Sequence, residues 1–322
     1  MVTIPPLLVV LVKPVFFVYV FPWKIDGEKN LISQGNEVVL KYPDRIVVAH
    51  SNRLLSYSQQ ARDTRDEEVI FDLTGTTFLT PFGIVLLAGT ISECLSQQKK
   101  VGYRKPRRRR TREFLSGIGF NEFFRLSDVE HNIESSHVQL RRLDSINPLL
   151  TDQIIEVFDH AITMTEGLQG SLRLAINELM TNAFDHSGSK RGCYVCAQTY
   201  EEIIRLCVAD FGVGLLTKLG SKYNLKDSYS AIKLAVREGI TTRSEQAGGL
   251  GLWHIQRFIR VNHGKMCVLS GDGKALWDFK GARSRLRKQT MHLPFGGTII
   301  NLEINVDRES VYFLTGEEDQ IF

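Results

Sequence analysis

Two polar side chains, Glu178 and Asn182, stand four residues apart in the stretch 168–187 (LQGSLRLAINELMTNAFDHS). Apolar residues recur in this stretch at the three-and-four spacing that predicts an amphipathic helix. Residues four apart lie on the same side of a helix, so the carboxylate would stand one turn from the amide, beside an apolar wall. This pair suits a divalent cation and a nearby water, and the alternative interpretation is an ordinary polar outer face.

Further along the chain, a carboxylate ends a predicted strand and glycines follow it. The stretches 192–199 and 203–209 read as two strands, and the second runs into the motif DFGVG at 210–214. Glycines allow the backbone to come close to a flat ligand. Asp210 would then be an acceptor suited to an exocyclic amine.

Two more glycine clusters complete the pattern. The segment AGGLGL at 247–252 opens a predicted helix, and GGT at 296–298 enters an alternating strand. Glycines before a helix leave backbone N–H groups and the positive end of the helix dipole free for an anion such as phosphate. A lone glycine cluster also occurs as a simple helix-entry loop, so the indication of a nucleotide site depends on all four motifs occurring in this order.

In this order ELMTNAFDH, DFGVG, GGLGL and GGT resemble the N, G1, G2 and terminal boxes of the GHKL superfamily, the histidine-kinase-like ATPases. The resemblance covers about residues 148–306. It implies a Bergerat-type α/β sandwich, with a mixed sheet and helices on one face, and it implies ATP and Mg²⁺ as ligands.

The resemblance also implies roles for individual residues. Asn182 matches the asparagine that binds Mg²⁺, Glu178 the carboxylate that orients or deprotonates the nucleophile, and Asp210 the aspartate that binds adenine. Residues 215–246 would form a lid, Arg243 is a candidate for the terminal phosphate, and Asp185 and His186 are candidate supporting groups. The other positions implied to touch the nucleotide are Gly212, Gly214, Gly249, Leu250, Gly251 and Thr298.

Upstream, short strands and helices alternate, which indicates an α/β module. Strands are expected at 38–40, 46–49, 69–73 and 101–103, and helices at 54–66, 84–98 and 111–126. The run FDLTGTTFLTPFGIVLLAG and the later IGFNEFF resemble the STAS domain of anti-anti-sigma factors, where a partner kinase phosphorylates a serine in a short loop. The matching positions here begin Thr80-Pro81, and since proline has no hydroxyl, the phospho-switch is not carried over. Thr77 or Thr80 would substitute only with a shifted loop.

Composition narrows the class of protein. The chain has 322 residues, 43% hydrophobic and 24% charged, which suits one large or two medium globular domains. Its net charge of +4 does not demand nucleic acid as a partner. The basic stretch 99–112 carries nine Lys or Arg and no acid, but few aromatic residues to stack bases. A solvated loop or a protein-docking surface is therefore the preferred interpretation of this stretch.

The cysteines and the first residues bear on the compartment. Five scattered cysteines favour a reducing cytosol over a disulfide scaffold, so we expect a cytoplasmic protein. Cys193 and Cys196 form a CxxC within a predicted strand, where residues three apart point to opposite faces. Residues 1–24 hold two apolar runs broken by Lys13 and Pro14. They are read as an apolar arm, a weak membrane-associating segment or a leader.

The expected organisation is an apolar segment (1–30), a STAS-like domain (31–127), a linker (128–147), an ATPase-like domain (148–310) and a tail (311–322). The leading functional hypothesis is an ATP- and Mg²⁺-binding regulator, similar to anti-sigma serine kinases, that hydrolyses ATP or phosphorylates a protein Ser or Thr. The alternative is a non-catalytic, ATP-dependent interaction switch. A sensor histidine kinase is less favoured because the region around His131 and His137 lacks a long dimerising hairpin. A protein target is expected, and a homodimer is left open.

Overall fold

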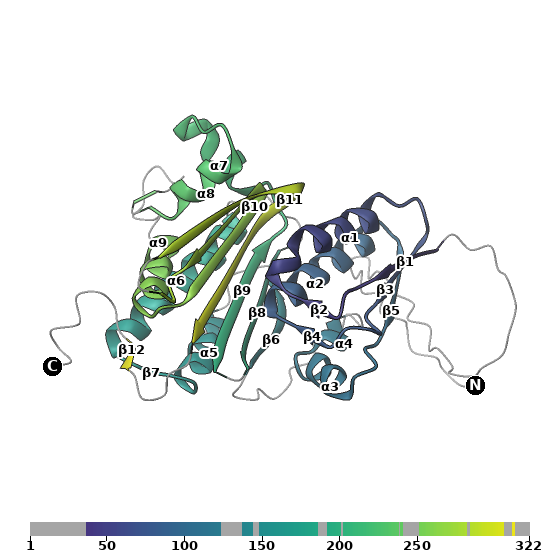
Figure 1. Cartoon of the computed structure of the whole chain (residues 1–322), viewed down its shortest axis with the longest axis horizontal. Coiled ribbons are helices and arrows are strands. Elements are labelled where there is room, and N and C mark those ends of the chain that lie inside the picture. The colour runs from purple at the N-terminus through teal and green to yellow at the C-terminus, as the bar shows by residue number, and fades with distance from the viewer. Residues whose placement is uncertain are drawn as a thin grey trace, which may run out of the picture.

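The computed structural model describes residues 37–123, 137–143, 148–185, 192–200, 202–237, 239–240, 251–281, 284–305 and 311–312. The apolar segment 1–30 and most of the tail 311–322 lie outside these ranges. Within them the chain combines helices with both parallel and antiparallel sheets, so the predicted α/β class is confirmed. Figure 1 shows two sheets with the helices α1 and α2 between them.

The N-terminal unit, residues 37–123, is built on a parallel three-stranded sheet of order β1-β3-β5. Strands and helices occur in the predicted order, with two corrections: the expected strand 46–49 ends at residue 46 and is followed by a 3-10 helix, and the expected helix 111–126 is divided into α3 and α4. The elements in chain order are β1 (Glu37–Lys41), β2 (Arg45–Ile46), the 3-10 helix η1 (Val48–His50), α1 (Ser51–Asp63), β3 (Glu68–Asp72), β4 (Phe78–Leu79), α2 (Pro81–Ser96), β5 (Lys100–Arg104), α3 (Arg109–Gly117) and α4 (Phe120–Phe123).

The C-terminal unit, residues 137–312, is built on a five-stranded sheet of order β10-β11-β9-β8-β6. The elements in chain order are β6 (His137–Leu143), α5 (Pro148–Asp159), β7 (Thr163–Met164), α6 (Glu166–Asp185), β8 (Cys193–Tyr200), β9 (Ile203–Asp210), α7 (Gly214–Tyr223), α8 (Ser228–Ala235), α9 (Gly251–Val261), β10 (Lys265–Asp278), β11 (Arg285–Asn305) and β12 (Val311–Tyr312).

Two expectations about this unit need correction. We expected a mixed sheet, but each pair of neighbours among these five strands is antiparallel. We also expected a linker at 128–147, whereas residues 137–143 of it form the edge strand β6, which pairs with β8. Leu140 and Leu143 of this strand are buried. Its sequence HVQLRRL holds four polar or basic residues among seven, which explains why it reads as a linker.

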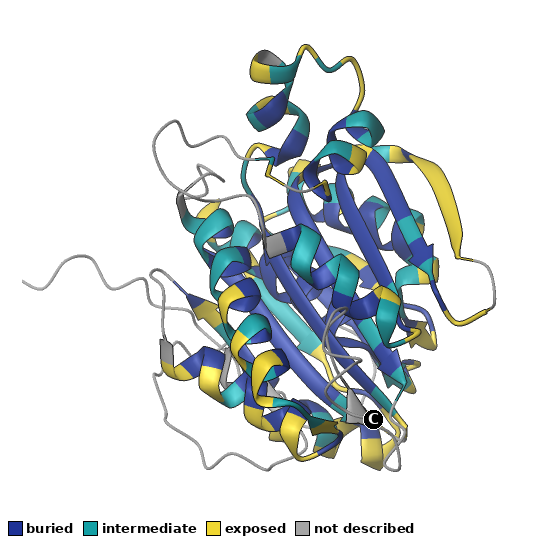
Figure 2. Cartoon of the chain, turned by 90° about the vertical axis from the view of Figure 1, so that its left-hand side faces the viewer, coloured by how far each residue is buried: buried dark blue, intermediate teal, exposed yellow. Residues whose placement is uncertain are grey.

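The five-stranded sheet has a hydrophobic core on each face. On one face α5, α6 and α9 pack against residues such as Val195 and Leu206. On the other face, residues such as Cys196 and Cys207 pack in one cluster with the N-terminal unit. Helices thus cover both faces, not one as expected, because α1 and α2 cover the second. Figure 2 shows the buried strands beneath helices with exposed outer sides.

Strand alternation accounts for this division into two cores. Cys193 belongs to the first core and Cys196 to the second, so the two thiols of the CxxC diverge, as predicted. Within the described part of the chain all five cysteines are buried, and none forms a disulfide. Burial raises the pKa of the Cys196 thiol to about 12, which keeps that thiol protonated.

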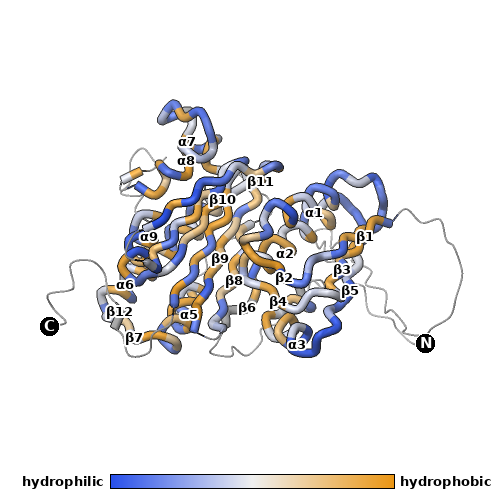
Figure 3. Tube along the Cα trace, in the orientation of Figure 1, coloured by the Kyte–Doolittle hydropathy of each residue, from blue (hydrophilic) through white to orange (hydrophobic). Residues whose placement is uncertain are grey.

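Helix α2 lies at the centre of the second core. Residues 81–91 are all buried, and Figure 3 shows much of the helix as hydrophobic. A helix that is apolar on all sides must be covered on all sides. Here the N-terminal sheet and the five-stranded sheet provide that cover. Among the described residues no helix is both long and apolar enough to cross a membrane.

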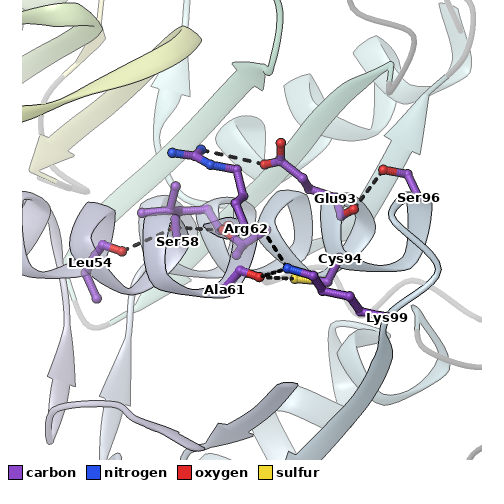
Figure 4. Close-up of polar contacts among 10 residues, drawn as sticks. Leu54, Ser58, Ala61, Arg62, Glu93, Cys94, Ser96 and Lys99 are labelled. Carbon is purple, nitrogen blue, oxygen red and sulfur yellow. Dashed lines mark hydrogen bonds and ion pairs between the residues drawn. The ribbon is translucent and has the colours of Figure 1, made fainter. Parts of the chain in front are cut away.

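Polar contacts fix α2 against α1 (Figure 4). The hydroxyls of Ser58 and Thr90 lie 2.8 Å apart inside the core, and Arg62 pairs with Glu93 at 3.7 Å. The Lys99 ammonium donates to the carbonyl oxygens of Ala61 and Arg62 at 2.7 and 2.6 Å. It therefore satisfies carbonyl groups that the end of α1 leaves without an intrahelical partner.

The other basic residues of the stretch 99–112 include paired side chains and exposed ones. Arg104 pairs with Asp72, and Arg109 with Glu113 four residues later. Residues 107–110, all arginine, are exposed beside and at the start of α3. The exposed pair Arg109–Glu113 contributes little to stability. That the exposed part of the stretch docks a protein stays a prediction.

Candidate functional site

The helix α6 carries the first two candidate residues. Its buried stripe, including Leu172, Ile176 and Leu179, packs in the first core. Thr151 of α5 donates to the side chain of Asn177 at 2.5 Å, which fixes the rotation of α6. Glu178 and Asn182, each half-buried, then line a cavity together. The prediction that this pair shares one side of a helix, beside an apolar wall, is confirmed.

The third candidate, Asp210, is the last residue of β9. It pairs with Cys193 of β8 on one side and Thr298 of β11 on the other, so its backbone is held from both sides. Its carboxylate Oδ1 accepts the Gly212 N–H at 2.9 Å, and only 3% of the residue is exposed. The turn after β9 is thus closed by the aspartate itself.

Burial raises the pKa of Asp210 to about 6. Three groups oppose this rise by stabilising the ionised form: the Lys218 ammonium and the backbone N–H groups of Gly212 and Thr298. A buried carboxylate with a raised pKa is a feature typical of functional sites. A ligand that donates a hydrogen bond to this carboxylate would offset part of the cost of its burial.

The GGT motif crosses directly over this turn. Gly297 has φ of +112°, and a Cβ there would lie 2.1 Å from the Asp210 carbonyl oxygen. Only glycine permits both the conformation and the approach. The motif therefore brings Thr298, which is 5% exposed, into the same cavity as Asp210.

Ser270 of β10 ties the two glycine motifs together and was not anticipated from the sequence. Its hydroxyl is fully buried, accepts the Leu215 N–H at 2.8 Å and donates to the Gly297 carbonyl at 2.9 Å. One side chain thus joins the start of α7 to the bend of β11. A single serine in a strand gives no sequence signal of this role.

Glu178, Asn182, Asp210 and Thr298 line one cavity, whose empty volume is about 730 Å³ including the part open to solvent. The lining comes from α6, β9, α7, the end of α8, residue 240, the start of α9 and β11. The lining residues are Glu178, Leu179, Asn182, Ala183, Val208, Asp210, Leu215, Lys218, Leu219, Ala235, Ile240, Leu252, Thr298 and Ile300.

The other predicted site residues divide between the described and undescribed parts of the chain. Gly212 and Gly214 lie in the turn and at the start of α7, next to the cavity, and Gly251 begins α9. Arg243, Gly249, Leu250 and His186 lie outside the described residues, as does the side chain of Asp185. Leu252, one residue into α9, reaches the cavity. Leu215, Lys218 and Leu219 of the expected lid line one of its walls.

In the loop that resembles a phospho-acceptor site, the hydroxyl of Thr80 is buried. Thr80 is 4% exposed and its hydroxyl donates to the Ile46 carbonyl at 3.4 Å, while Pro81 begins α2. Thr77 is exposed, and its hydroxyl donates to the Asp44 carbonyl at 3.2 Å. Thr80 therefore cannot receive a phosphoryl group without opening of the fold.

Lys218 of α7 is the group of the cavity that sequence reasoning missed. Its ammonium donates to the Asn182 backbone oxygen at 3.3 Å. Burial lowers the pKa of this lysine, and the Asp210 carboxylate opposes the shift. A lysine in an amphipathic helix reads as a solvated residue, and only the fold shows that it faces two candidate residues.

The polar groups of the cavity fit a nucleotide with a divalent cation. Asp210 offers a buried acceptor and Lys218 a half-buried cation, which suit an amine and a phosphate respectively. No cluster of three metal-binding side chains occurs among the described residues. Mg²⁺ is commonly held by few protein oxygens together with phosphates and waters, so Asn182 and a bound nucleotide would suffice.

Replacing Lys218 with Met is expected to weaken ATP binding by roughly ten- to hundredfold, the range for a hydrogen bond to a charged group. Adenosine carries no phosphate, so its affinity should change less. Titration calorimetry with both ligands measures the two effects. Lys222→Met, on the exposed side of the same helix, is the matched control. Equal losses for ATP and adenosine would show that Lys218 does not contact phosphate.

Neither a scan of protein families nor a search of curated proteins found a match to this chain.

Proposed function

We propose that this chain is a nucleotide-binding protein that holds ATP and Mg²⁺ in the cavity between α6, α7, β9 and β11. The observation that supports this most strongly is the lining of that cavity. Four polar residues from three elements line it together: Glu178 and Asn182 of α6, Asp210 of β9 and Thr298 of β11. The resemblance of their motifs to the GHKL boxes adds an independent argument from the sequence.

Each group then has a role that its chemistry suits. The Asp210 carboxylate accepts a hydrogen bond from the adenine amine, and the Lys218 ammonium binds phosphate oxygens. Asn182 holds Mg²⁺, which offsets negative charge on the phosphates. The start of α9 follows the predicted phosphate loop at 247–250, so its free N–H groups are suited to the same phosphates. Arg243 is proposed for the terminal phosphate.

More particularly, we propose a GHKL-type regulator that transfers the γ-phosphoryl group to water or to a Ser or Thr of a protein target. The oxygen of the nucleophile forms a bond to the γ-phosphorus while the bond to ADP breaks. Glu178 accepts the proton of the nucleophile. An external target is favoured over the chain's own STAS-like loop, since Thr80 is buried and Pro81 has no hydroxyl. Thr77 is exposed, but its hydroxyl is bonded to the Asp44 carbonyl and it lies outside the matching position. A cytoplasmic location belongs to the same proposal.

The alternative is an interaction switch that binds ATP without turnover. One observation favours it: the N-terminal unit shares a hydrophobic core with the sheet that carries Asp210. A change at the nucleotide would then reach the STAS-like unit directly. Both functions need the same ATP site, and they differ in what happens to the γ-phosphate.

Incubation with γ-labelled ATP tests the proposal. Wild-type protein should bind ATP in the presence of Mg²⁺ and release labelled phosphate or label a protein added from the native cell extract. Asn182→Ala should lose the Mg²⁺ dependence of binding. ATP binding without release or labelling would favour the switch. No ATP binding by the wild type would reject both functions.

A further inference from the structure

Phe211 stands between two residues of the cavity turn, Asp210 and Gly212, but its ring lies in the other core. It is 7% exposed and belongs to the cluster shared with the N-terminal unit. Its ring meets those of Tyr194 and Phe295 edge-on, with centroids 5.3 and 5.2 Å away. Neighbouring residues of one chain segment thus face the candidate nucleotide site and the N-terminal unit.

The N-terminal unit receives this ring at Gly89 of α2. A Cβ at Gly89 would lie 1.7 Å from Cζ of Phe211 and 2.1 Å from its Cε2. Such distances exclude any side chain at position 89 while the ring keeps its place. The ring has little room to move, since Tyr194 and Phe295 flank it. The ring of Phe211 therefore packs directly against the backbone of Gly89.

Helix α2 is also bonded to α1 by polar contacts close to Gly89. Thr90, next to Gly89, contacts Ser58 of α1 through its hydroxyl at 2.8 Å and donates to the Leu86 carbonyl at 2.8 Å. Glu93, one turn further, pairs with Arg62 of α1 (Figure 4). A larger residue at 89 would consequently press on Phe211 instead of displacing α2.

A displacement of Phe211 would also displace the backbone of its neighbours Asp210 and Gly212, which lie at the cavity. Asp210 closes its turn with the hydrogen bond to the Gly212 N–H, and Phe211 is the residue inside that turn. We propose that Gly89 and Phe211 are positioning residues for the nucleotide site: α2 of the N-terminal unit sets the placement of the Asp210 carboxylate. This inference rests on the proposed ATP site and adds that the N-terminal unit controls adenine recognition.

The test measures affinities for ATP and for inosine triphosphate, which lacks the adenine amine, on the full chain. Gly89→Ala should weaken ATP binding at least about tenfold, since an imperfect hydrogen bond to a charged group costs that much. It should change inosine triphosphate binding less, so the ratio of the two affinities falls. Gly75→Ala is the matched control, because a Cβ at Gly75 meets nothing within 4 Å.

A compensating variant separates positioning from a general loss of stability. Phe211→Leu shortens the side chain, so the double variant Gly89→Ala/Phe211→Leu has room for the added methyl group. The double variant should recover ATP selectivity relative to Gly89→Ala, which gives a coupling in the double-mutant cycle. If Gly89→Ala does not fold, Phe211→Leu alone should still lower the selectivity for ATP by several-fold.

The outcomes distinguish the two proposals. If Gly89→Ala and Phe211→Leu both fold and select ATP as well as Gly75→Ala does, the positioning role is rejected while the ATP site stands. If the double variant shows no recovery, the coupling between the two residues is rejected. If the wild type binds neither nucleotide, the proposed function fails, and the positioning inference fails with it.

Discussion

Phosphate release by the variant Glu178→Gln is expected to be slower than that of the wild type by roughly 10²- to 10⁴-fold, the usual contribution of a general base. Glutamine keeps the size of the side chain but cannot accept the proton of a water or hydroxyl. ATP affinity should stay within a few-fold, because Glu178 is proposed to act on the nucleophile and not on the nucleotide. Single-turnover phosphate release and ATP titration measure the two quantities separately.

Glu166→Gln provides the control for this experiment. Glu166 lies on the same helix α6, in its exposed first turn, away from the cavity lining. It should release phosphate at the wild-type rate. Equal rates for Glu178→Gln and wild type would remove Glu178 from the chemistry. Absence of release in all three proteins, with ATP still bound, would leave the interaction switch as the function.

The second large effect is expected at Asp210, where Asn should both stabilise the empty protein and weaken ATP binding. Asn presents one oxygen and one amino group. If its oxygen keeps the Gly212 N–H, its amino group faces the adenine amine, and two donors meet. The expected loss of ATP affinity is roughly ten- to hundredfold, as for a lost hydrogen bond to a charged group.

The stabilising effect of Asp210→Asn should depend on pH. Because the pKa of Asp210 is raised to about 6 in the fold, the ionised form destabilises the folded state. This cost is absent below the unfolded pKa near 4, grows as pH rises towards 6, and is complete above that value. Its full size is about 3 kcal/mol, from about 1.4 kcal/mol per pKa unit. Asn removes this cost.

Urea unfolding at several pH values measures this dependence. Asp210→Asn should be more stable than wild type at pH 8, and the difference should shrink towards pH 4. Asp272→Asn, at an exposed position of β10, should show no such gain. A gain that is constant over this range would mean that ionisation of Asp210 does not cost stability. Retained ATP selectivity in Asp210→Asn would separately reject its role in binding adenine.

Local patterns were sufficient to predict much of this site. The four-residue spacing of Glu178 and Asn182 determines one helix face, and strand alternation determines that Cys193 and Cys196 diverge. The position of Asp210 as a candidate binding residue could be predicted because it ends an apolar strand and glycines follow it. A buried charge lowers stability unless it has a partner. Each of these inferences needs only neighbouring residues and a known period.

The parts that were missed depend on contacts between distant segments. Lys218 and Ser270 act through partners 36 and 55 residues away, and no local period reveals such pairs. Strand β6 lies at the edge of the sheet, and most of its residues are polar or basic, so its sequence resembles a loop. The uniform apolar character of α2 was the one available sign that both of its sides are covered.

The core shared by the two units bears on how the chain can be divided. If residues 37–123 were removed, the sheet face that carries Tyr194, Phe211 and Phe295 would lose its cover. Exposed apolar surfaces of this kind promote self-association. The C-terminal unit expressed alone should therefore aggregate, and the boundary that looks like a domain junction in the sequence is an unsuitable place to cut the gene for separate expression.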